Sequence, residues 1–382
     1  MDGAQETALG LLVERYGKKT VNTVVRRVAA LPVEVPSWGF GRGGTRFASY
    51  PSGREPSTVA QRIAAAGRFH KRTGNGATVA LHFPWDGSSA QDIRNLKGWL
   101  QKAGVRPGTI NLNLFDTRPT GPLDARIRFG SLTSPLASVR KASVAHGFEC
   151  IRIMRRLGSD TIVLWLPDGT NSPGQMSLYD QADRLDETVR AIYQRLRRGE
   201  KLLVEYKLFE PGFYSTAIQD YARSRELCRL CGPRARVLVD LGHHPKTTNV
   251  EQIVAHLVRD GELGGFHFND SFYADDDLAT GSLKPAQLFR ILCTLVEGER
   301  RGCQKVDRIA FMIDQSHNVK DPLEEMVESL GNIEVAYAKA LLVDWDALKN
   351  AQDRCDPSTA DAVLRDAFLT DVRPLLAKAH GS

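Results

Sequence analysis

Short apolar runs alternate with longer amphipathic stretches along most of the chain. Eight of these runs, each five or six residues long, are rich in Val, Ile, Leu and Phe. Continuous apolar runs of this length are typical of strands that are buried on both faces of a parallel sheet. We therefore predict strands over residues 31–36, 78–82, 109–113, 161–166, 202–206, 236–240, 264–268 and 308–313.

The stretches between these runs have helical periodicity. We predict helices over residues 58–70, 90–104, 136–158, 178–198, 215–231, 249–261 and 285–302, and several of them end at a glycine, as helices often do. Eight strands that alternate with helices predict a (β/α)8 TIM barrel, an α/β fold, rather than an open sheet. The Gly-rich segment 39–44 lacks the G-x-G-x-x-G spacing, so it is weak evidence for the open alternative.

Helical segments flank the predicted barrel. We divide the chain into an N-terminal helical extension (1–30), a barrel catalytic domain (31–345) and a C-terminal helical tail (346–382). The last barrel helix is predicted over 333–343 and a tail helix over 358–378. We expect the extensions to build contacts between subunits, with simple packing onto the barrel as the alternative.

The composition is that of an ordinary globular protein. The 382 residues are 42% hydrophobic and 25% charged, which excludes disordered and collagen-like chains. The longest apolar runs are far shorter than the roughly 20 residues that cross a bilayer, and the first residues lack the apolar segment of a signal peptide. Six cysteines show no disulfide framework, which predicts reduced thiols and a cytoplasmic location. Cys228-x-x-Cys231 is interpreted as structural, with a redox or zinc site as the alternative.

The net charge of +6 is unevenly distributed. Residues 1–72 carry 12 basic and 5 acidic side chains, whereas the remaining residues carry 39 and 40. We interpret the basic segment as a solvated helical surface, with an arm for an anionic partner as the alternative. Neither nucleic acid nor a membrane is the expected partner.

Metal-ligand side chains stand at the ends of four successive predicted strands. These residues are Glu205, Asp240, His267 and Asp314. The carboxyl ends of barrel strands form the active site in this architecture. Burying three carboxylates together without a cation is costly, because each loses hydration and repels the others. We therefore predict a bound divalent cation, and a carboxylate-rich set without thiolate favours Mn²⁺ or Mg²⁺, with Co²⁺ able to substitute.

A second group of ligands lies beside the first. His243 follows Asp240 by three residues, and Asp275 and Asp277 follow the next strand. We infer a second divalent cation, with Asp240 bridging the two ions. Paired ions of this kind can bind adjacent oxygens of a substrate and polarise a carbonyl group.

Other residues near the strand ends suggest a substrate pocket. Lys207 lies two residues after Glu205, so both point to the same face, where the ammonium group is either a counter-charge or a partner for a developing oxyanion. His82, with Asp86 near it, is a candidate acid or base. Aromatic residues also follow these strands, and their rings suit the C–H faces of a sugar, although they can equally be core lids: Trp38, Trp85, Phe115 and Trp165.

These motifs, in this order, resemble the xylose-isomerase-like barrel superfamily. Within it, the segments 204–211, 239–244 and 266–271 are most similar to the L-rhamnose isomerase family of broad specificity. The resemblance runs from about residue 33 to about residue 321. It implies an aldose–ketose isomerase, typically a Mn²⁺-dependent homotetramer, acting on small-molecule sugars.

The resemblance also implies roles for individual residues. A structural metal would be held by Glu205, Asp240, His267 and Asp314, and a catalytic metal by Asp240, His243, Asp275 and Asp277. His82 would serve the ring oxygen or proton traffic, Lys207 would stabilise charge at O1, and the sugar would be lined by Trp38, Trp85, Phe115 and Trp165. Either a hydride moves between C2 and C1, or a proton moves through an enediol with Asp314 or a metal-bound water as the base.

Three other functions stay open at this point. A sugar 3-epimerase on a similar barrel would show one metal and two symmetric glutamates. A metal-dependent phosphodiesterase or endonuclease would have more histidine ligands and a basic groove. A degenerate barrel that serves as a binding scaffold would lack some of the ligands.

Overall fold

The predicted barrel is confirmed by the computed structural model. The structure describes residues 3–41, 53, 55–115, 125–210, 214–272, 277–316 and 320–381. Eight parallel strands close in the order β1-β10-β9-β8-β5-β4-β3-β2. Their bounds are β1 Val33–Pro36, β2 Thr78–Phe83, β3 Arg106–Leu112, β4 Thr161–Leu164, β5 Lys201–Glu205, β8 Ala235–Asp240, β9 Leu263–Phe268 and β10 Ala310–Ile313.

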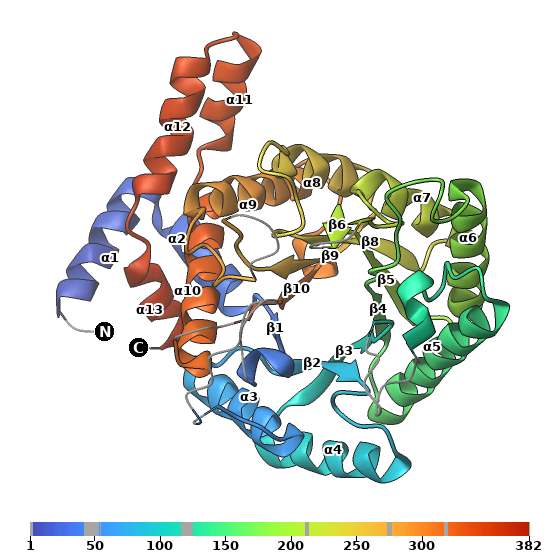
Figure 1. Cartoon of the computed structure of the whole chain (residues 1–382). Coiled ribbons are helices and arrows are strands. Elements are labelled where there is room, and N and C mark those ends of the chain that lie inside the picture. The colour runs from blue at the N-terminus through green and yellow to red at the C-terminus, as the bar shows by residue number, and fades with distance from the viewer. Residues whose placement is uncertain are drawn as a thin grey trace.

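One helix follows each barrel strand, and the helices form the outer ring in Figure 1. They are α3 Val59–Thr73, α4 Ala90–Ala103, α5 Ala137–Leu157, α6 Leu178–Gln194, α7 Tyr221–Cys231, α8 Val250–Arg259, α9 Pro285–Arg300 and α10 Pro322–Leu341. Local sequence sets their ends: Thr58 and Ser89 form capping boxes at α3 and α4, and Gly104 and Gly158 end α4 and α5 in the left-handed conformation.

The inside of the barrel has its own apolar cluster. Val163, Leu203, Leu238 and Met312 pack together there, on four different strands. Their neighbours along each strand point outward into the large core between the strands and the helices, because side chains alternate along a strand. The same alternation decides which residue at each strand end reaches into the mouth of the barrel.

The extensions are helical, as predicted, but they are divided differently. The N-terminal extension forms α1 Gly3–Tyr16 and α2 Lys18–Ala29, separated at Gly17, whose φ is 81°. The single tail helix predicted over 358–378 is wrong. The chain instead forms α11 Trp345–Asp353, α12 Pro357–Leu369 and α13 Arg373–His380, because a proline in the first turn of α12 and of α13 starts a new helix.

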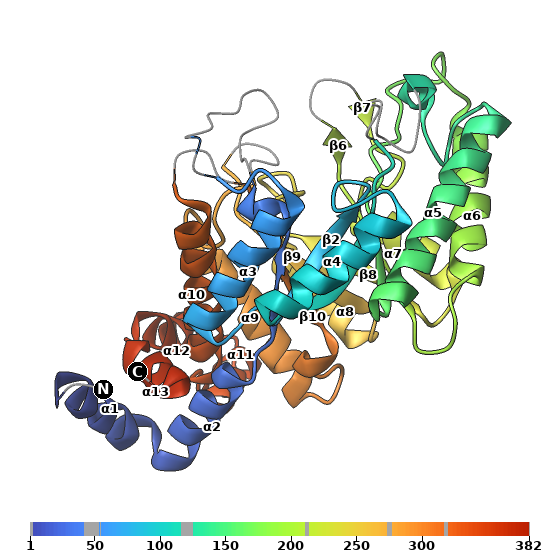
Figure 2. The same cartoon turned by 90° about the horizontal axis from the view of Figure 1, so that it is seen from below.

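The extensions lie together beside the barrel. Helix α13 packs against α2, and the Tyr16 hydroxyl hydrogen-bonds the Thr370 hydroxyl at 2.7 Å. Helices α11 and α12 project away from the barrel (Figure 1), and α1, α2 and α13 lie toward the end opposite the short hairpin β6–β7 (Figure 2). That hairpin comprises β6 Phe209–Glu210 and β7 Tyr214–Ser215.

The hairpin corrects the start of one predicted helix. Ser215 belongs to β7, and α7 begins only at Tyr221, where the Asp220 side chain caps it. The last barrel helix also begins earlier than the predicted residue 333, at Pro322. Among the residues that the structure describes, no helix combines the length and apolar character needed to cross a lipid bilayer.

Close packing of α3 on α4 gives a stability prediction. A Cβ atom added at Gly67 would lie 2.6 Å from the backbone oxygen of Ala103, whereas a Cβ atom at Gly98 would meet nothing within 4 Å. We expect Gly67→Ala to lower the free energy of unfolding by about 1–3 kcal/mol. Gly98→Ala is the matched control and should raise it by up to ~1 kcal/mol, because alanine favours a helix. Equal free energies of unfolding for the two variants, measured by chemical denaturation, would contradict this packing.

Candidate metal centre

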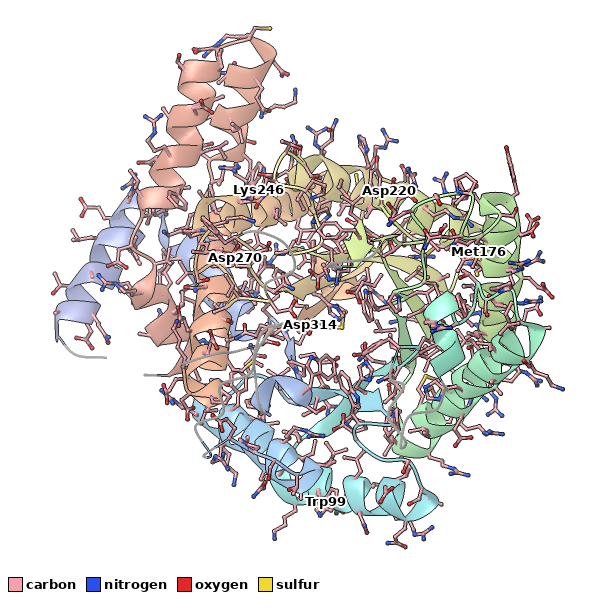
Figure 3. All side chains as sticks on the ribbon, in the orientation of Figure 1. Trp99, Met176, Asp220, Lys246, Asp270 and Asp314 are labelled. Atoms are coloured by element: carbon pink, nitrogen blue, oxygen red, sulfur yellow. The ribbon has the colours of Figure 1, made fainter. Side chains whose placement is uncertain are left out.

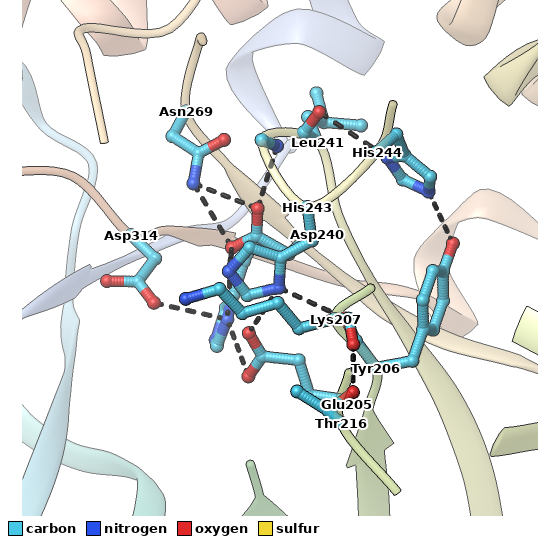
Figure 4. Close-up of polar contacts among 12 residues, drawn as sticks. Glu205, Tyr206, Lys207, Thr216, Asp240, Leu241, His243, His244, Asn269 and Asp314 are labelled. Carbon is cyan, nitrogen blue, oxygen red and sulfur yellow. Dashed lines mark hydrogen bonds and ion pairs between the residues drawn. The ribbon is translucent and has the colours of Figure 1, made fainter. Parts of the chain in front are cut away.

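Four metal-ligand side chains meet at the mouth of the barrel. Glu205, Asp240, His267 and Asp314 each offer one ligand atom, and these atoms lie within 4.8 Å of one another. Figure 3 shows Asp314 near the centre of the barrel, and Figure 4 shows the contacts of the cluster. The residues predicted from the four strand ends are thus brought together.

Strand register explains this convergence. Strands β5, β8, β9 and β10 are neighbours in the barrel, and Asp240 lies directly beside His267. Glu205 and Asp240 each stand two residues after an interior leucine of the same strand, so they share its inward direction. Asp314 likewise stands two residues after the interior residue Met312, which lies beside His267 in the strand register.

The imidazole of His267 faces all three carboxylates. Its Nδ1 atom lies 3.2 Å from Glu205 Oε2, 3.3 Å from Asp314 Oδ2 and 3.8 Å from Asp240 Oδ2. Glu205, Asp240 and His267 are buried, so water screens these charges poorly. The cluster therefore concentrates negative charge around a single nitrogen.

The concentration of charge shifts the pKa values of Asp240 and His267. Burial raises the pKa of Asp240 to about 7, and the Glu205 carboxylate adds to the rise. Burial alone would lower the pKa of His267, but the Glu205, Asp314 and Asp240 carboxylates raise it to about 10. The protein alone thus offsets its carboxylates by holding a proton on the imidazole. A divalent cation can replace that proton, and three carboxylates with one imidazole suit Mn²⁺ or Mg²⁺.

Neighbouring groups orient the carboxylates. Asn269 Nδ2 donates to Asp240 Oδ1 at 3.0 Å and to Oδ2 at 3.1 Å, and the Gly242 N–H donates to Oδ1 at 2.8 Å. Trp38 Nε1 donates to Asp314 Oδ1 at 2.9 Å. Such partners fix the direction of a ligand's lone pairs. Asn269 was not among the residues expected from the sequence, although its position two residues after His267, on the same strand face, was a usable signal.

The second predicted ligand group is described in part. His243 reaches the cluster: its Nδ1 lies 3.3 Å from Glu205 Oε1, and its Nε2 lies 3.8 Å from Asp240 Oδ2. Asp277 has a positive φ of 48° in a loop held to the barrel by Ser316, whose N–H donates to the Asp277 carbonyl at 2.9 Å. Asp275 lies outside the described residues.

Lys207 is buried beside the cluster. Burial alone would raise the pKa of Glu205, but His267, His243 and Lys207 hold it below its usual range. The ammonium nitrogen also lies over the ring of Trp165, 5.2 Å from its centre. Figure 4 shows the Lys207 side chain extending toward the carboxylates. This cation thus contacts an aromatic ring and the charged cluster together.

The predicted pocket aromatics form one continuous wall. The ring centres of Trp38 and His82 are 5.6 Å apart, and His82 stacks on Trp85 at 4.1 Å. Phe115 meets Trp85 edge-on at 5.7 Å and Trp165 at 4.8 Å. The wall begins at Trp38, which bonds Asp314, and ends at Trp165, which contacts Lys207.

Asp86, noted in the sequence because it lies near His82, has a structural role at the ends of two strands. Its carboxylate accepts hydrogen bonds from the backbone N–H of His82 at 2.8 Å, the Ser37 hydroxyl at 2.6 Å and the Arg62 guanidinium at 2.9 Å. It therefore ties the ends of β1 and β2 to α3. Asp168, which the sequence analysis did not single out, similarly holds the 131–133 loop at the end of β4.

Comparison with known proteins agrees with this geometry. A sequence profile of the xylose isomerase-like TIM barrel family matches residues 72–293. A probable sugar isomerase of Rhizobium meliloti is 41% identical over 360 residues, which cover 94% of this chain and 83% of that protein. A probable sugar isomerase of Mesorhizobium japonicum is 40% identical over 373 residues, which cover 98% and 85%. The chain therefore belongs to the xylose isomerase-like TIM barrel family.

Solved structures share the fold at much lower identity. A family 2 AP endonuclease of Brucella melitensis has a TM-score of 0.53 at 14% identity, covering 77% of this chain and 96% of that one. A D-psicose 3-epimerase solved with D-fructose has a TM-score of 0.53 at 12% identity, covering 81% and 97%. At these identities the likeness concerns the barrel fold alone. The two relatives at about 40% identity, which align over 94% and 98% of this chain, are both named as probable sugar isomerases.

The charge balance of the cluster gives a second prediction. We expect Mn²⁺ at a hundredfold excess over its Kd to stabilise the wild-type protein by about 2.7 kcal/mol, seen as a rise in Tm. Asp240→Asn should abolish this rise. It should leave the metal-free protein folded and of similar stability, because the removal of one buried like charge offsets the Asn269 hydrogen bond that the new amide NH2 cannot accept. Asp346→Asn, on the exposed side of α11, should keep the full rise. A metal-induced rise in Asp240→Asn would contradict the assignment.

Proposed function

We propose that this protein is a metal-dependent aldose–ketose isomerase that converts L-rhamnose to L-rhamnulose and also acts on related aldoses. The observation that carries the proposal is the cluster of buried Glu205, Asp240 and His267 with half-buried Asp314, which has Lys207 beside it inside an aromatic-lined mouth. A sugar suits such a pocket because its C–H faces can pack on rings while its oxygens meet charged groups. The names of the two bacterial relatives support the same reaction class.

The proposed site holds two divalent cations, with Mn²⁺ favoured and Mg²⁺ or Co²⁺ able to substitute. Glu205, Asp240, His267 and Asp314 would hold one ion. Asp240, His243, Asp275 and Asp277 would hold the other, a set supported here by the approach of His243 to Asp240. Bound ions would supply Lewis acidity at two adjacent sugar oxygens, O1 and O2.

The protein's own side chains account for the remaining steps. Trp38, Trp85, Phe115 and Trp165 would pack against the sugar and exclude water. The His82 ring, stacked on Trp85 at 4.1 Å, would move a proton at the ring oxygen when the sugar opens. The Lys207 ammonium would donate a hydrogen bond to O1 as negative charge develops there.

Two routes remain for the transfer between C2 and C1. In the first, a hydride moves directly between the two carbons. In the second, Asp314 or a water molecule held at the site removes the C2 proton, an enediol forms, and a proton is then returned to C1. Turnover in D₂O separates them, because only the second route exchanges the transferred hydrogen with solvent. Extensive deuterium incorporation into the ketose would argue against the hydride shift.

We also propose that the subunits assemble as a homotetramer. Helices α11 and α12 project from the barrel and leave Leu369 strongly exposed at the end of α12. A pair of helices that stands off its own barrel is available to pack against another subunit (Figure 1).

The first functional prediction concerns the substrate class. Metal-stripped protein should be inactive on L-rhamnose, L-lyxose, L-mannose, D-allose and D-xylose. Addition of Mn²⁺ should restore ketose formation from at least L-rhamnose, as measured by chromatography of the products. If the protein instead converts one ketose to its epimer and acts on no aldose, the proposed isomerase is wrong and the protein is an epimerase.

The second functional prediction concerns Lys207. If its ammonium acts on charge that develops during the reaction, Lys207→Met should lower kcat by about 10²–10³-fold and leave KM within a few-fold. Lys201→Met is a matched control, because Lys201 is exposed at the opposite end of the same strand, β5. It should leave both constants unchanged. A change confined to KM in Lys207→Met would instead assign Lys207 to ground-state binding.

A further inference from the structure

We infer that Tyr206 and His244 form a pair that positions His243 for metal binding. The inference rests on the proposed two-ion site, and it concerns residues that lie outside the ligand set itself. Tyr206 directly follows β5, and His244 directly follows His243 in the turn after β8. The pair therefore links the ends of two neighbouring strands.

Tyr206 contacts both histidines through different groups. Its backbone oxygen lies 3.0 Å from His243 Nδ1, and its hydroxyl oxygen lies 2.6 Å from His244 Nε2. The side chain is fully buried and points away from the mouth, because Glu205 and Lys207 on either side point inward. Figure 4 shows the two contacts on opposite sides of the Tyr206 backbone.

These contacts fix the proton on His243. A carbonyl oxygen only accepts hydrogen bonds, so the nitrogen that faces Tyr206 O carries the proton. In the neutral imidazole, the form that can bind a metal, Nε2 then keeps the lone pair, and it lies 3.8 Å from Asp240 Oδ2. This separation is too long for a hydrogen bond, but it suits two ligands of one ion, whose donor atoms lie about 3–4 Å apart at bond lengths near 2.1 Å. The backbone of Tyr206 therefore selects the tautomer that a ligand requires.

The contact between the Tyr206 hydroxyl and His244 stabilises the 241–244 turn on its outer side. His244 Nδ1 faces the Leu241 carbonyl at 3.5 Å, so Nε2 accepts the hydrogen bond that the Tyr206 hydroxyl donates. On the inner side, the Gly242 N–H donates to the Asp240 carboxylate. The 241–244 turn is thus held from both sides, and His243 stands between the two supports.

A second tyrosine–histidine pair provides a matched control. The Tyr221 hydroxyl lies 3.3 Å from His256 Nδ1, and this contact joins α7 to α8 on the outer ring. Tyr221→Phe removes one hydroxyl from a tyrosine–histidine contact, as Tyr206→Phe does, but away from the mouth of the barrel. Any effect of losing a hydroxyl in general should appear in both variants.

Binding of Mn²⁺ itself is the decisive measurement. Calorimetric titration of metal-free full-length protein should show two ions per subunit for the wild type and for Tyr221→Phe. Tyr206→Phe should keep the Kd of the first ion within about threefold and weaken the second by about 10–100-fold, the range typical of groups that orient a ligand. In Tyr206→Phe, the electron paramagnetic resonance signal of a coupled Mn²⁺ pair should disappear at Mn²⁺ concentrations that still occupy the first site.

His244→Leu tests the same contact from the other partner. It should weaken binding of the second ion to the same extent as Tyr206→Phe. The double variant should lose little more affinity, because both changes break the same hydrogen bond. An unchanged Kd for the second ion in both single variants would overturn the inference and leave the proposed isomerase intact. A wild-type protein that binds only one ion per subunit would overturn the two-ion proposal and this inference together.

Discussion

The rest of the site depends on one constraint, the confinement of three carboxylates around one imidazole at the mouth of a closed barrel. His267 Nδ1 lies within 3.8 Å of Glu205, Asp314 and Asp240, in surroundings where water screens charge poorly. Such a cluster is stabilised by compensating positive charge, which the protein alone supplies as a proton on His267 and as the nearby Lys207 ammonium. This need for a cation gives the neighbouring groups their roles.

The barrel satisfies the constraint by making the cluster rigid. Closure of the sheet fixes the register of four neighbouring strands, and the apolar layer of Leu203, Leu238 and Met312 beneath the cluster leaves the carboxylates only the direction of the mouth. Trp38 then bonds Asp314 Oδ1 and leaves Oδ2 facing His267, whereas Asn269 orients Asp240 by donating to both of its oxygens. In the proposed reaction, a rigid cage of this kind would hold an ion without reorganising as charge moves on the substrate.

The sequence was sufficient for the features that follow from local periodicity. Alternation along each strand, together with the shared mouth of all barrel strands, predicted that Glu205, Asp240, His267 and Asp314 would meet. Contacts between residues far apart in sequence were not predictable in this way, since no local pattern indicates that Trp38 bonds Asp314 across 276 positions. The same holds for Asp86, which was noted only as lying near His82, because its contacts with Ser37 and Arg62 join it to residues 49 and 24 positions away.

The mouth has two chemically distinct sides, and Lys207 stands where they meet. One side is the row of rings from Trp38 to Trp165, and the other is the carboxylate cluster. A buried lysine needs both neighbours: Glu205 offsets its charge, and the face of Trp165 attracts the ammonium without competing for its hydrogen bonds. A sugar, with apolar C–H faces and an edge of oxygens, is complementary to such a divided mouth, and its carbonyl end would lie at the lysine.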